Sequence, residues 1–136
     1  MKKLLPVLFA CGLLSAGCKK SQDAPPPPIT VENLAGAYKI IADVTTTDGV
    51  STDGYASYQP CAKDDIWTFN TDNSLVVTDA GVVCDPSDSW SNSWSLEGTT
   101  ITVAGQSGTV TKFDGSIMEI TLDLSDTSKE KITFKK

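Results

Sequence analysis

The chain has 136 residues and a formal net charge of −6, with 17 acidic residues against 11 basic residues, all of them lysines. An acidic chain without arginine is a poor nucleic-acid binder, because phosphate contacts require a basic surface. The chain also contains no histidine, which removes the commonest general base and the commonest metal ligand. Its length suits a single domain with one hydrophobic core.

Residues 1–17 have the pattern of a secretory signal peptide. Lys2 and Lys3 precede an apolar run over residues 4–14, and small side chains occupy positions 15–17. Such a segment directs export and is removed from the mature protein. The apolar run is shorter than the ~20 residues that a membrane-spanning helix needs, so we expect it to be cleaved.

Cys18 directly follows this segment. The sequence from Leu14 to Cys18 resembles the lipobox of bacterial lipoproteins, in which the cysteine thiol receives a diacylglyceryl group. The resemblance implies acyl chains such as palmitate on Cys18, and two chains anchor a protein stably to a membrane. It places the mature protein in the cell envelope, on the periplasmic or the outer face of the outer membrane. The alternative is an ordinary cleaved signal whose next residue is an unmodified cysteine.

Residues 18–29 are predicted to form a tether between the lipid and a folded domain. Four consecutive prolines, Pro25 to Pro28, favour extended polyproline II, which rises ~3.1 Å per residue. We interpret the segment as a stiff spacer, with a proline-rich docking ligand as the alternative. The folded domain is expected to span residues 30–136.

This domain has an all-β pattern, because short runs rich in valine, isoleucine, threonine and aromatic residues alternate with turn signals. Asp72-Asn73, Glu97-Gly98 and Asp114-Gly115 predict hairpin turns, since these residue types tolerate positive φ. Strands are predicted at 38–46, 54–58, 65–70, 74–79, 89–96, 100–104, 109–113, 117–124 and 130–135. Consecutive hairpins protect their edges best by closing, so we predict an antiparallel up-and-down barrel of eight or nine strands.

Alternation of apolar and polar residues identifies the side chains that should point into the barrel. The predicted inward set is Tyr38, Trp67, Phe69, Trp94, Leu96, Ile101, Val103, Met118, Ile120, Leu122, Leu124, Ile132 and Phe134. The large rings in this set could fill much of the interior themselves. Whether room remains for a ligand depends on the enclosed volume.

Cys61 and Cys84 are predicted to form a disulfide. If the chain turns about Asp72-Asn73, the two cysteines face each other across the hairpin ladder. Opposed residues lie ~4.5 to 5.5 Å apart at Cα, which suits a disulfide, and exported proteins fold in an oxidising compartment. A redox or metal role is the weaker alternative, because the chain has no CxxC motif and no histidine.

Several segments together carry a family resemblance. They are residues 34–38 (LAGAY), 61–65 (CAKDD), 67–70 (WTFN), Cys84-Asp85, 93–96 (SWSL), 101–103 (ITV) and 132–136 (ITFKK). In this order they resemble the bacterial lipocalin-like domain family over residues 31–136. The resemblance implies a lipocalin-like barrel whose open mouth binds a small hydrophobic or amphiphilic molecule.

The aromatic residues are the candidate binding residues. Tyr55, Tyr58 and Trp90 lie in polar stretches, so we predict them at the barrel mouth or at a surface for an envelope protein partner; the alternative is that they cover the rim. Trp67, Trp94 and Tyr38 either pack in the core or touch a ligand. The function predicted is therefore a non-catalytic binding module. The alternative is a structural or interaction lipoprotein with a filled barrel and no ligand.

Acidic residues offer the remaining candidate chemistry. Asp79, Asp85 and Asp88 gather near Cys84, and calcium takes oxygen ligands, but their spacing matches no recognised metal loop and solvated carboxylates are the preferred interpretation. Asp64 and Asp65 are neighbours, and neighbours in a strand point to opposite faces, which argues against a catalytic pair. Without a nucleophile and base to name, we expect no enzyme, no cofactor and no metal site.

Overall fold

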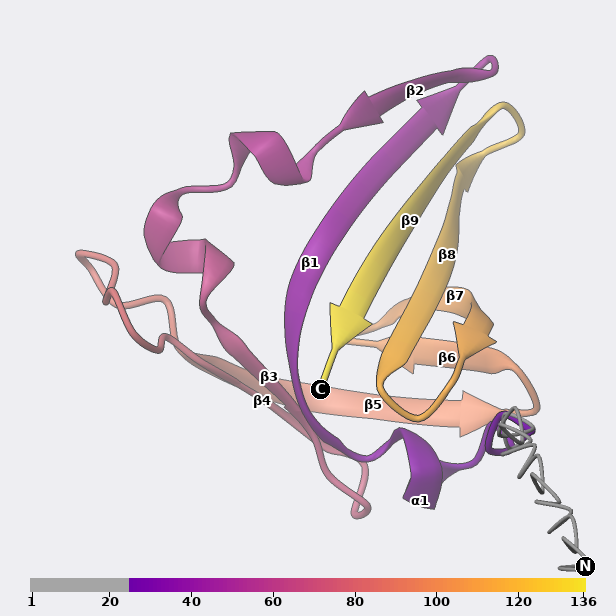
Figure 1. Ribbon diagram of the computed structural model, residues 1–136, viewed down its shortest axis with the longest axis horizontal. Helices are drawn as coiled ribbons and strands as arrows, with labels where there is room; N and C mark the ends of the chain where they lie inside the picture. Colours follow the sequence, from indigo (N-terminus) through magenta and orange to yellow (C-terminus); the bar gives the residue numbers. More distant parts are fainter. Residues whose placement is uncertain (1–24) are drawn as a thin grey trace, which may run out of the picture.

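The computed structural model describes residues 25–136, which form nine β-strands with one short α-helix and two 3-10 helices (Figure 1). In chain order they are α1 (Val31–Leu34), β1 (Gly36–Thr47), β2 (Val50–Asp53), η1 (Tyr55–Ser57), η2 (Pro60–Lys63), β3 (Ile66–Phe69), β4 (Ser74–Thr78), β5 (Trp90–Glu97), β6 (Thr100–Val103), β7 (Gln106–Phe113), β8 (Ile117–Ser125) and β9 (Ser128–Lys135). The predicted all-β class is confirmed.

β1 closes the sheet into a barrel. Its first residues, from Gly36 to Tyr38, pair with β3, and from Lys39 onward it pairs with β9 along its other edge. Every neighbouring pair from β3 to β9 is antiparallel, so eight strands form a closed up-and-down barrel. β2 is an additional strand on the free edge of β1, where it pairs with residues 44–47. The predicted eight- or nine-stranded barrel is therefore confirmed.

Alternating strand directions divide the loops between two ends of the barrel. One end holds α1, the turns at 70–74, 98–99 and 114–116, and the C-terminus; the other holds the turn at 48–49, the crossing segment 54–65, loop 79–89 and the turns at 104–105 and 126–127. The chain enters at the α1 end, since Pro27 lies within contact distance of Gly115. We call these the α1 end and the open end.

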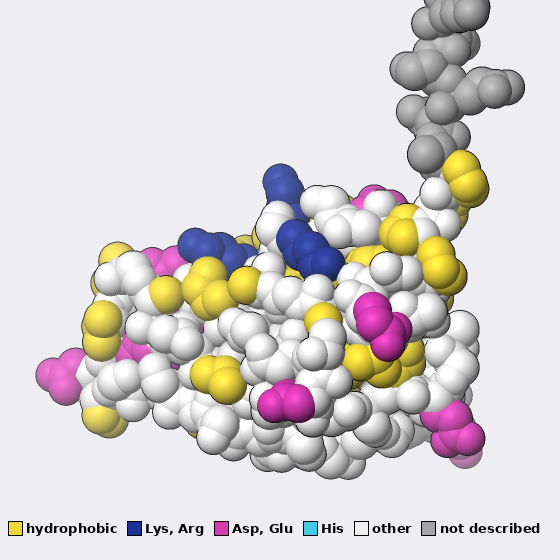
Figure 2. All heavy atoms as spheres, turned by 90° about the horizontal axis from the view of Figure 1, so that it is seen from below, with side chains coloured by type: hydrophobic (Ala, Val, Ile, Leu, Met, Phe, Trp, Pro, Cys, Tyr) yellow, Lys and Arg dark blue, Asp and Glu magenta, His cyan; other side chains and the backbone are white. Residues whose placement is uncertain are grey.

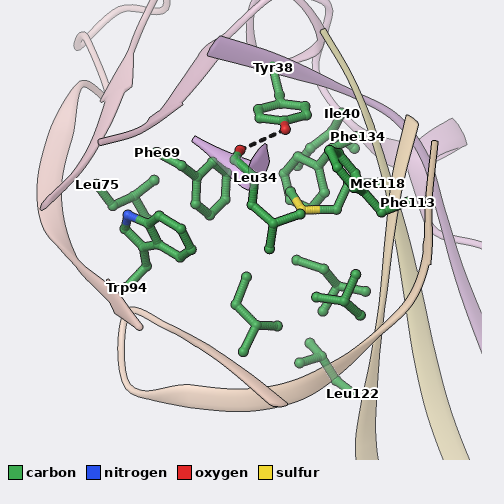
Figure 3. Close-up of a cluster of buried hydrophobic side chains, with 13 residues drawn as sticks. Leu34, Tyr38, Ile40, Phe69, Leu75, Trp94, Phe113, Met118, Leu122 and Phe134 are labelled. Atoms are coloured by element: carbon green, nitrogen blue, oxygen red, sulfur yellow. Dashed lines mark hydrogen bonds between the residues drawn. The ribbon is translucent and has the colours of Figure 1, made fainter. Parts of the chain in front are cut away.

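The α1 end is closed by a packed core (Figure 3). Thr30 caps α1 by accepting the backbone N–H of Asn33 at 3.3 Å, which turns the fully buried Leu34 into the barrel. The Tyr38 hydroxyl donates to the Leu34 carbonyl at 2.7 Å. The buried cluster consists of Leu34, Tyr38, Ile40, Phe69, Leu75, Trp94, Ile101, Val110, Phe113, Met118, Ile120, Leu122 and Phe134. On the face seen in Figure 2, apolar side chains lie in separate spots, whereas the large apolar side chains are buried in this cluster.

Two predicted elements are wrong in detail. The strand predicted at 54–58 is displaced, because Asp48 (φ 51°) and Gly49 (φ 80°) form a tight turn that sends residues 50–53 back along β1. Asp53 then ends β2 by accepting the backbone N–H of Ala56 at 3.0 Å, and η1 follows. Leu124, predicted inward, is half exposed, since the β8–β9 register shifts between residues 123 and 125.

The predicted disulfide between Cys61 and Cys84 is confirmed, with Cα atoms 5.3 Å apart. The hairpin register behind the prediction is wrong by one residue. β3 and β4 pair Phe69 with Leu75, which centres the turn on Asp72 and makes it a three-residue loop with Asn73 at φ 68°. The cysteines lie beyond this ladder, in η2 and in loop 79–89, so they join two loops at the open end.

Candidate functional site

An apolar pocket of about 230 Å³ occupies the open end of the barrel. It is lined by Trp67, Trp90, Ile101, Val103, Ala104, Gln106, Ile120, Leu122, Ile132 and Phe134. These residues come from β3 and from every strand between β5 and β9, together with the turn that joins β6 to β7. Their convergence depends on barrel closure, because the strands that carry them are distant in sequence.

The lining has the chemistry of a site for apolar molecules. Nine of the ten side chains are apolar, and the tenth, Gln106, offers one amide group. Gln106 and Ala104 are exposed at the mouth, and Trp90 retains 37% of its surface in solvent. A ligand would therefore lose its water shell against hydrocarbon and aromatic walls, while a polar group on it could reach Gln106 or solvent.

Two tryptophans form one wall of this pocket. Trp67 of β3 and Trp90 of β5 both pair with Val77 of the intervening strand β4, so all three side chains point to the same face. The indole rings are edge to face, with centroids 5.3 Å apart. Trp67 also contacts Phe134 edge to face at 5.7 Å. Such aromatic pairs hold their geometry well, so the wall is preformed.

The floor of the pocket is the aromatic core of the α1 end. Phe69 packs edge to face against Trp94 at 5.3 Å and against Tyr38 at 5.7 Å. The Trp94 indole N–H donates to the Asn70 carbonyl at 2.9 Å, and burial raises the pKa of the Tyr38 hydroxyl to about 12. These rings are almost fully buried and fill this half of the barrel, so the pocket ends above them.

Gly108 fixes another wall. It pairs with Ile101 and faces β8 so closely that a Cβ atom on it would lie 2.6 Å from Leu122 Cδ2 and 2.8 Å from the Thr121 carbonyl oxygen. The missing side chain lets β8 approach β7 and places the Leu122 side chain over Gly108. This close approach sets the position of one pocket-lining residue.

The structure separates the predicted aromatic residues into three groups. Trp67 and Trp90 line the pocket. Tyr38 and Trp94 lie in the packed core below it, 1% and 2% exposed, and are not among the lining residues. Tyr55 and Tyr58 lie on the crossing segment. Cys18, the predicted lipidation site, lies outside the described residues.

The crossing segment is held to the barrel by a polar cluster that local sequence patterns do not predict. The Tyr58 hydroxyl donates to Asp43 Oδ2 at 2.9 Å, and Asp43 is only 6% exposed. Glu130 on β9 lies beside them: burial, and then the charge of Asp43, raise the pKa of Glu130. Burial and the Asp43 hydrogen bond also raise the pKa of Tyr58. In the sequence, Asp43 falls at a polar position of the β1 alternation, and only the register shift between Ile40 and Ala42 turns it inward, so alternation predicts it on the outer face.

The pocket-lining residues other than the tryptophans were recognisable only as inward-facing. Alternation assigns six of them to the buried face but does not say how much space their side chains leave; they are Ile101, Val103, Ile120, Leu122, Ile132 and Phe134. Gln106 and Ala104 lie at a turn and carry no such signal.

Comparison of the chain with protein family models, with curated proteins and with solved structures finds no match. Within residues 25–136 no helix has the length and apolar character required to span a bilayer.

Proposed function

We propose that this chain is an envelope-anchored lipoprotein whose barrel binds a small hydrophobic or amphiphilic molecule in the apolar pocket. The observation that carries the proposal is an uncharged pocket of about 230 Å³ walled by Trp67 and Trp90. The resemblance to the bacterial lipocalin-like domain family points the same way. No catalytic role is proposed, because the lining offers no nucleophile or general base.

The volume limits the size of the ligand. Ligand pockets commonly enclose ~300 Å³ or more, so 230 Å³ suits a smaller molecule. An apolar cavity of ~150 Å³ accommodates benzene. The expected ligand is therefore one aromatic ring with short substituents, or the end of an acyl chain, with any polar group at the mouth near Gln106.

The affinity follows from the area that such a ligand buries. A ring system the size of an aromatic side chain buries ~150–250 Å², which at ~25 cal/mol per Å² contributes about 4–6 kcal/mol. Because association also costs translational and rotational freedom, this gain sets an upper limit on affinity, and the dissociation constant should be no lower than tens of micromolar. Binding of this strength is reversible, as a carrier or sensor requires.

The pocket faces away from the proposed anchor. The N-terminal segment joins the barrel at the α1 end, beside Gly115, whereas the pocket opens at the opposite end. With Cys18 lipidated, the mouth would be directed from the membrane into the surrounding aqueous space. Mass spectrometry of the mature N-terminus tests the anchor separately: an unmodified Cys18 would contradict it and leave the pocket proposal untouched.

Calorimetric titration with p-cresol, indole and hexanol tests the binding proposal. Val103→Trp places a large ring in the pocket and should abolish binding, whereas Val76→Trp, on the outer face of β4 and 38% exposed, is the matched control and should bind normally. Unfolding of each variant must remain cooperative. Absence of binding to the native protein would support the alternative, a structural or protein-interaction lipoprotein. Equal binding by both variants would place the ligand elsewhere.

A further inference from the structure

A groove of about 280 Å³ lies on the outer wall of the barrel, on the opposite face of the sheet from the apolar pocket. It forms where β1 leaves β3, because Tyr38 opposite Trp67 is the last pair between these strands and β1 then pairs with β9. Besides Tyr38, the groove is lined by Ala37, Lys39, Ile41, Ile66, Lys135 and Lys136. None of these lining residues is acidic.

The floor of the groove is apolar. Ala37, Lys39 and Ile41 alternate with the buried Tyr38 and Ile40, so their side chains point outward. Ile41 lies at the register shift between β1 and β9 and is 43% exposed. The groove therefore offers an apolar surface to a partner that has an apolar part.

The rim of the groove is cationic. Lys39 and Lys135 are direct partners in the β1–β9 ladder, and Ile117 pairs with Lys135 on its other side. Like charges directly opposite each other destabilise a sheet. Lys136 follows, with Nζ donating to the Asn33 carbonyl oxygen at 3.0 Å. Three positive charges thus surround one groove.

No ion pair within residues 25–136 neutralises these three lysines. Lys112 and Lys131 pair with Glu119, and Lys129 pairs with Asp123. Residues 30–136 carry 16 acidic side chains against seven lysines, so most cations of such a domain should find a carboxylate. On the face seen in Figure 2, lysine side chains gather on one side and apolar side chains lie beside them. The groove is therefore a cationic surface on an otherwise acidic domain.

The chain enters the domain beside this groove. The Asn33 side-chain amide donates to the Pro28 carbonyl oxygen at 2.9 Å, and the same residue accepts the Lys136 hydrogen bond. Between Cys18 and Pro25 a fully extended chain spans at most ~25 Å. An acylated Cys18 would therefore keep the α1 end, and the three lysines near it, within this distance of a bilayer.

We propose that the groove and its three lysines bind the anionic headgroups of a phospholipid bilayer, so that the barrel lies against the membrane on this wall. The proposal rests on the proposed lipid anchor, which supplies the proximity. Each lysine near an anionic lipid surface strengthens binding about fivefold. The attraction acts over ~8 Å at physiological salt, so carboxylates on the other walls oppose it little. The apolar pocket opens at the other end and stays accessible.

Lysine acetylation followed by mass spectrometry tests this contact in the full chain. Cys18, in a Cys11→Ser background, is coupled to a maleimide-bearing lipid in phosphatidylcholine vesicles with or without phosphatidylglycerol. The coupling imposes the tether, so the result does not depend on whether cells acylate Cys18. Lys39 and Lys135 should react at least fivefold more slowly on the anionic vesicles, and high salt should remove this protection. Lys129, at the other end of β9, should react at the same rate on both vesicles.

Lys39→Glu and its matched control Lys129→Glu separate the groove from a general attraction of lysines to the bilayer. Both positions are exposed, so both variants should unfold cooperatively. The protection of Lys135 on anionic vesicles should fall below twofold in Lys39→Glu and persist in Lys129→Glu. The proposal is overturned if Lys135 reacts equally fast on both vesicles, if high salt leaves the protection intact, or if the two variants behave alike. Failure of the anchor would show separately, as an unmodified Cys18 in the mature protein.

Discussion

Replacing Leu34 by alanine tests whether the single turn of α1 closes the barrel. Leu34 is fully buried beneath Tyr38 and the aromatic core. Leu→Ala removes about three methyl or methylene groups, worth about 0.8 kcal/mol each, and the cavity left behind adds to this loss. We therefore expect Leu34→Ala to lower the free energy of unfolding by about 2.5 to 5 kcal/mol, a large part of the ~5–15 kcal/mol available to a domain.

Urea unfolding followed by tryptophan fluorescence measures this change, and Leu124→Ala is the matched control. Leu124 has the same side chain but is half exposed in the β8 bulge, so its replacement should cost less than about 1 kcal/mol. Both variants should keep the native dependence on urea concentration, since the surface exposed on unfolding is nearly unchanged. Equal losses of unfolding free energy for the two variants, or a loss below about 1 kcal/mol for Leu34→Ala, would show that the Leu34 side chain does not close this end of the barrel.

Three further predictions concern the polar cluster, a turn and the disulfide. The raised pKa of Glu130 means that the stability contributed by its protonated form is present below the ordinary glutamate pKa and is lost as pH rises through the raised value. Glu130→Gln should therefore be more stable than the native protein at pH 7 and similar at pH 4, as thermal unfolding at both pH values would show; an equal difference at both would contradict the linkage. Ala104 has φ 50° beside Gly105, so Ala104→Asn should raise the free energy of unfolding by about 1 kcal/mol in urea titrations. Replacing both Cys61 and Cys84 by alanine opens a loop with a sequence separation of 23 and should cost about 3 kcal/mol, measured under non-reducing conditions; no loss would show that the unfolded chain gains little freedom.

The fold class and the inward-facing residues were predictable because their signals are local. Alternation in residues such as Trp67 and Phe69 marks the buried face of a strand from its own neighbours, and turn residues such as Asp114-Gly115 end strands wherever they occur. The disulfide was predictable as a pair, although the hairpin register used to infer it was one residue in error. A three-residue loop centred on Asp72 and a two-residue turn differ too little in sequence to be told apart.

The candidate site was only partly predictable. Trp67 and Trp90 could be singled out as aromatic residues, but that they share a wall depends on both strands pairing with Val77. Tyr58 was expected at a mouth or a partner surface; its hydrogen bond to Asp43 instead ties the crossing segment to β1. The two residues are 15 positions apart in the sequence, and no local sequence pattern predicts that they form a hydrogen bond.

The amino-acid sequence alone determined that the domain is all-β, which cysteines pair and many of the side chains that enter its interior, because strand periodicity and turn chemistry are properties of short segments and the folded domain offers only two cysteines. Only the tertiary structure decided that the barrel retains an apolar pocket of about 230 Å³, and that the carboxylates of Asp79 and Asp88 come within 4.8 Å of each other at its rim. The volume of a pocket and the contacts between residues distant in sequence depend on strand register and barrel closure. Both of these depend on the pairing of all the strands.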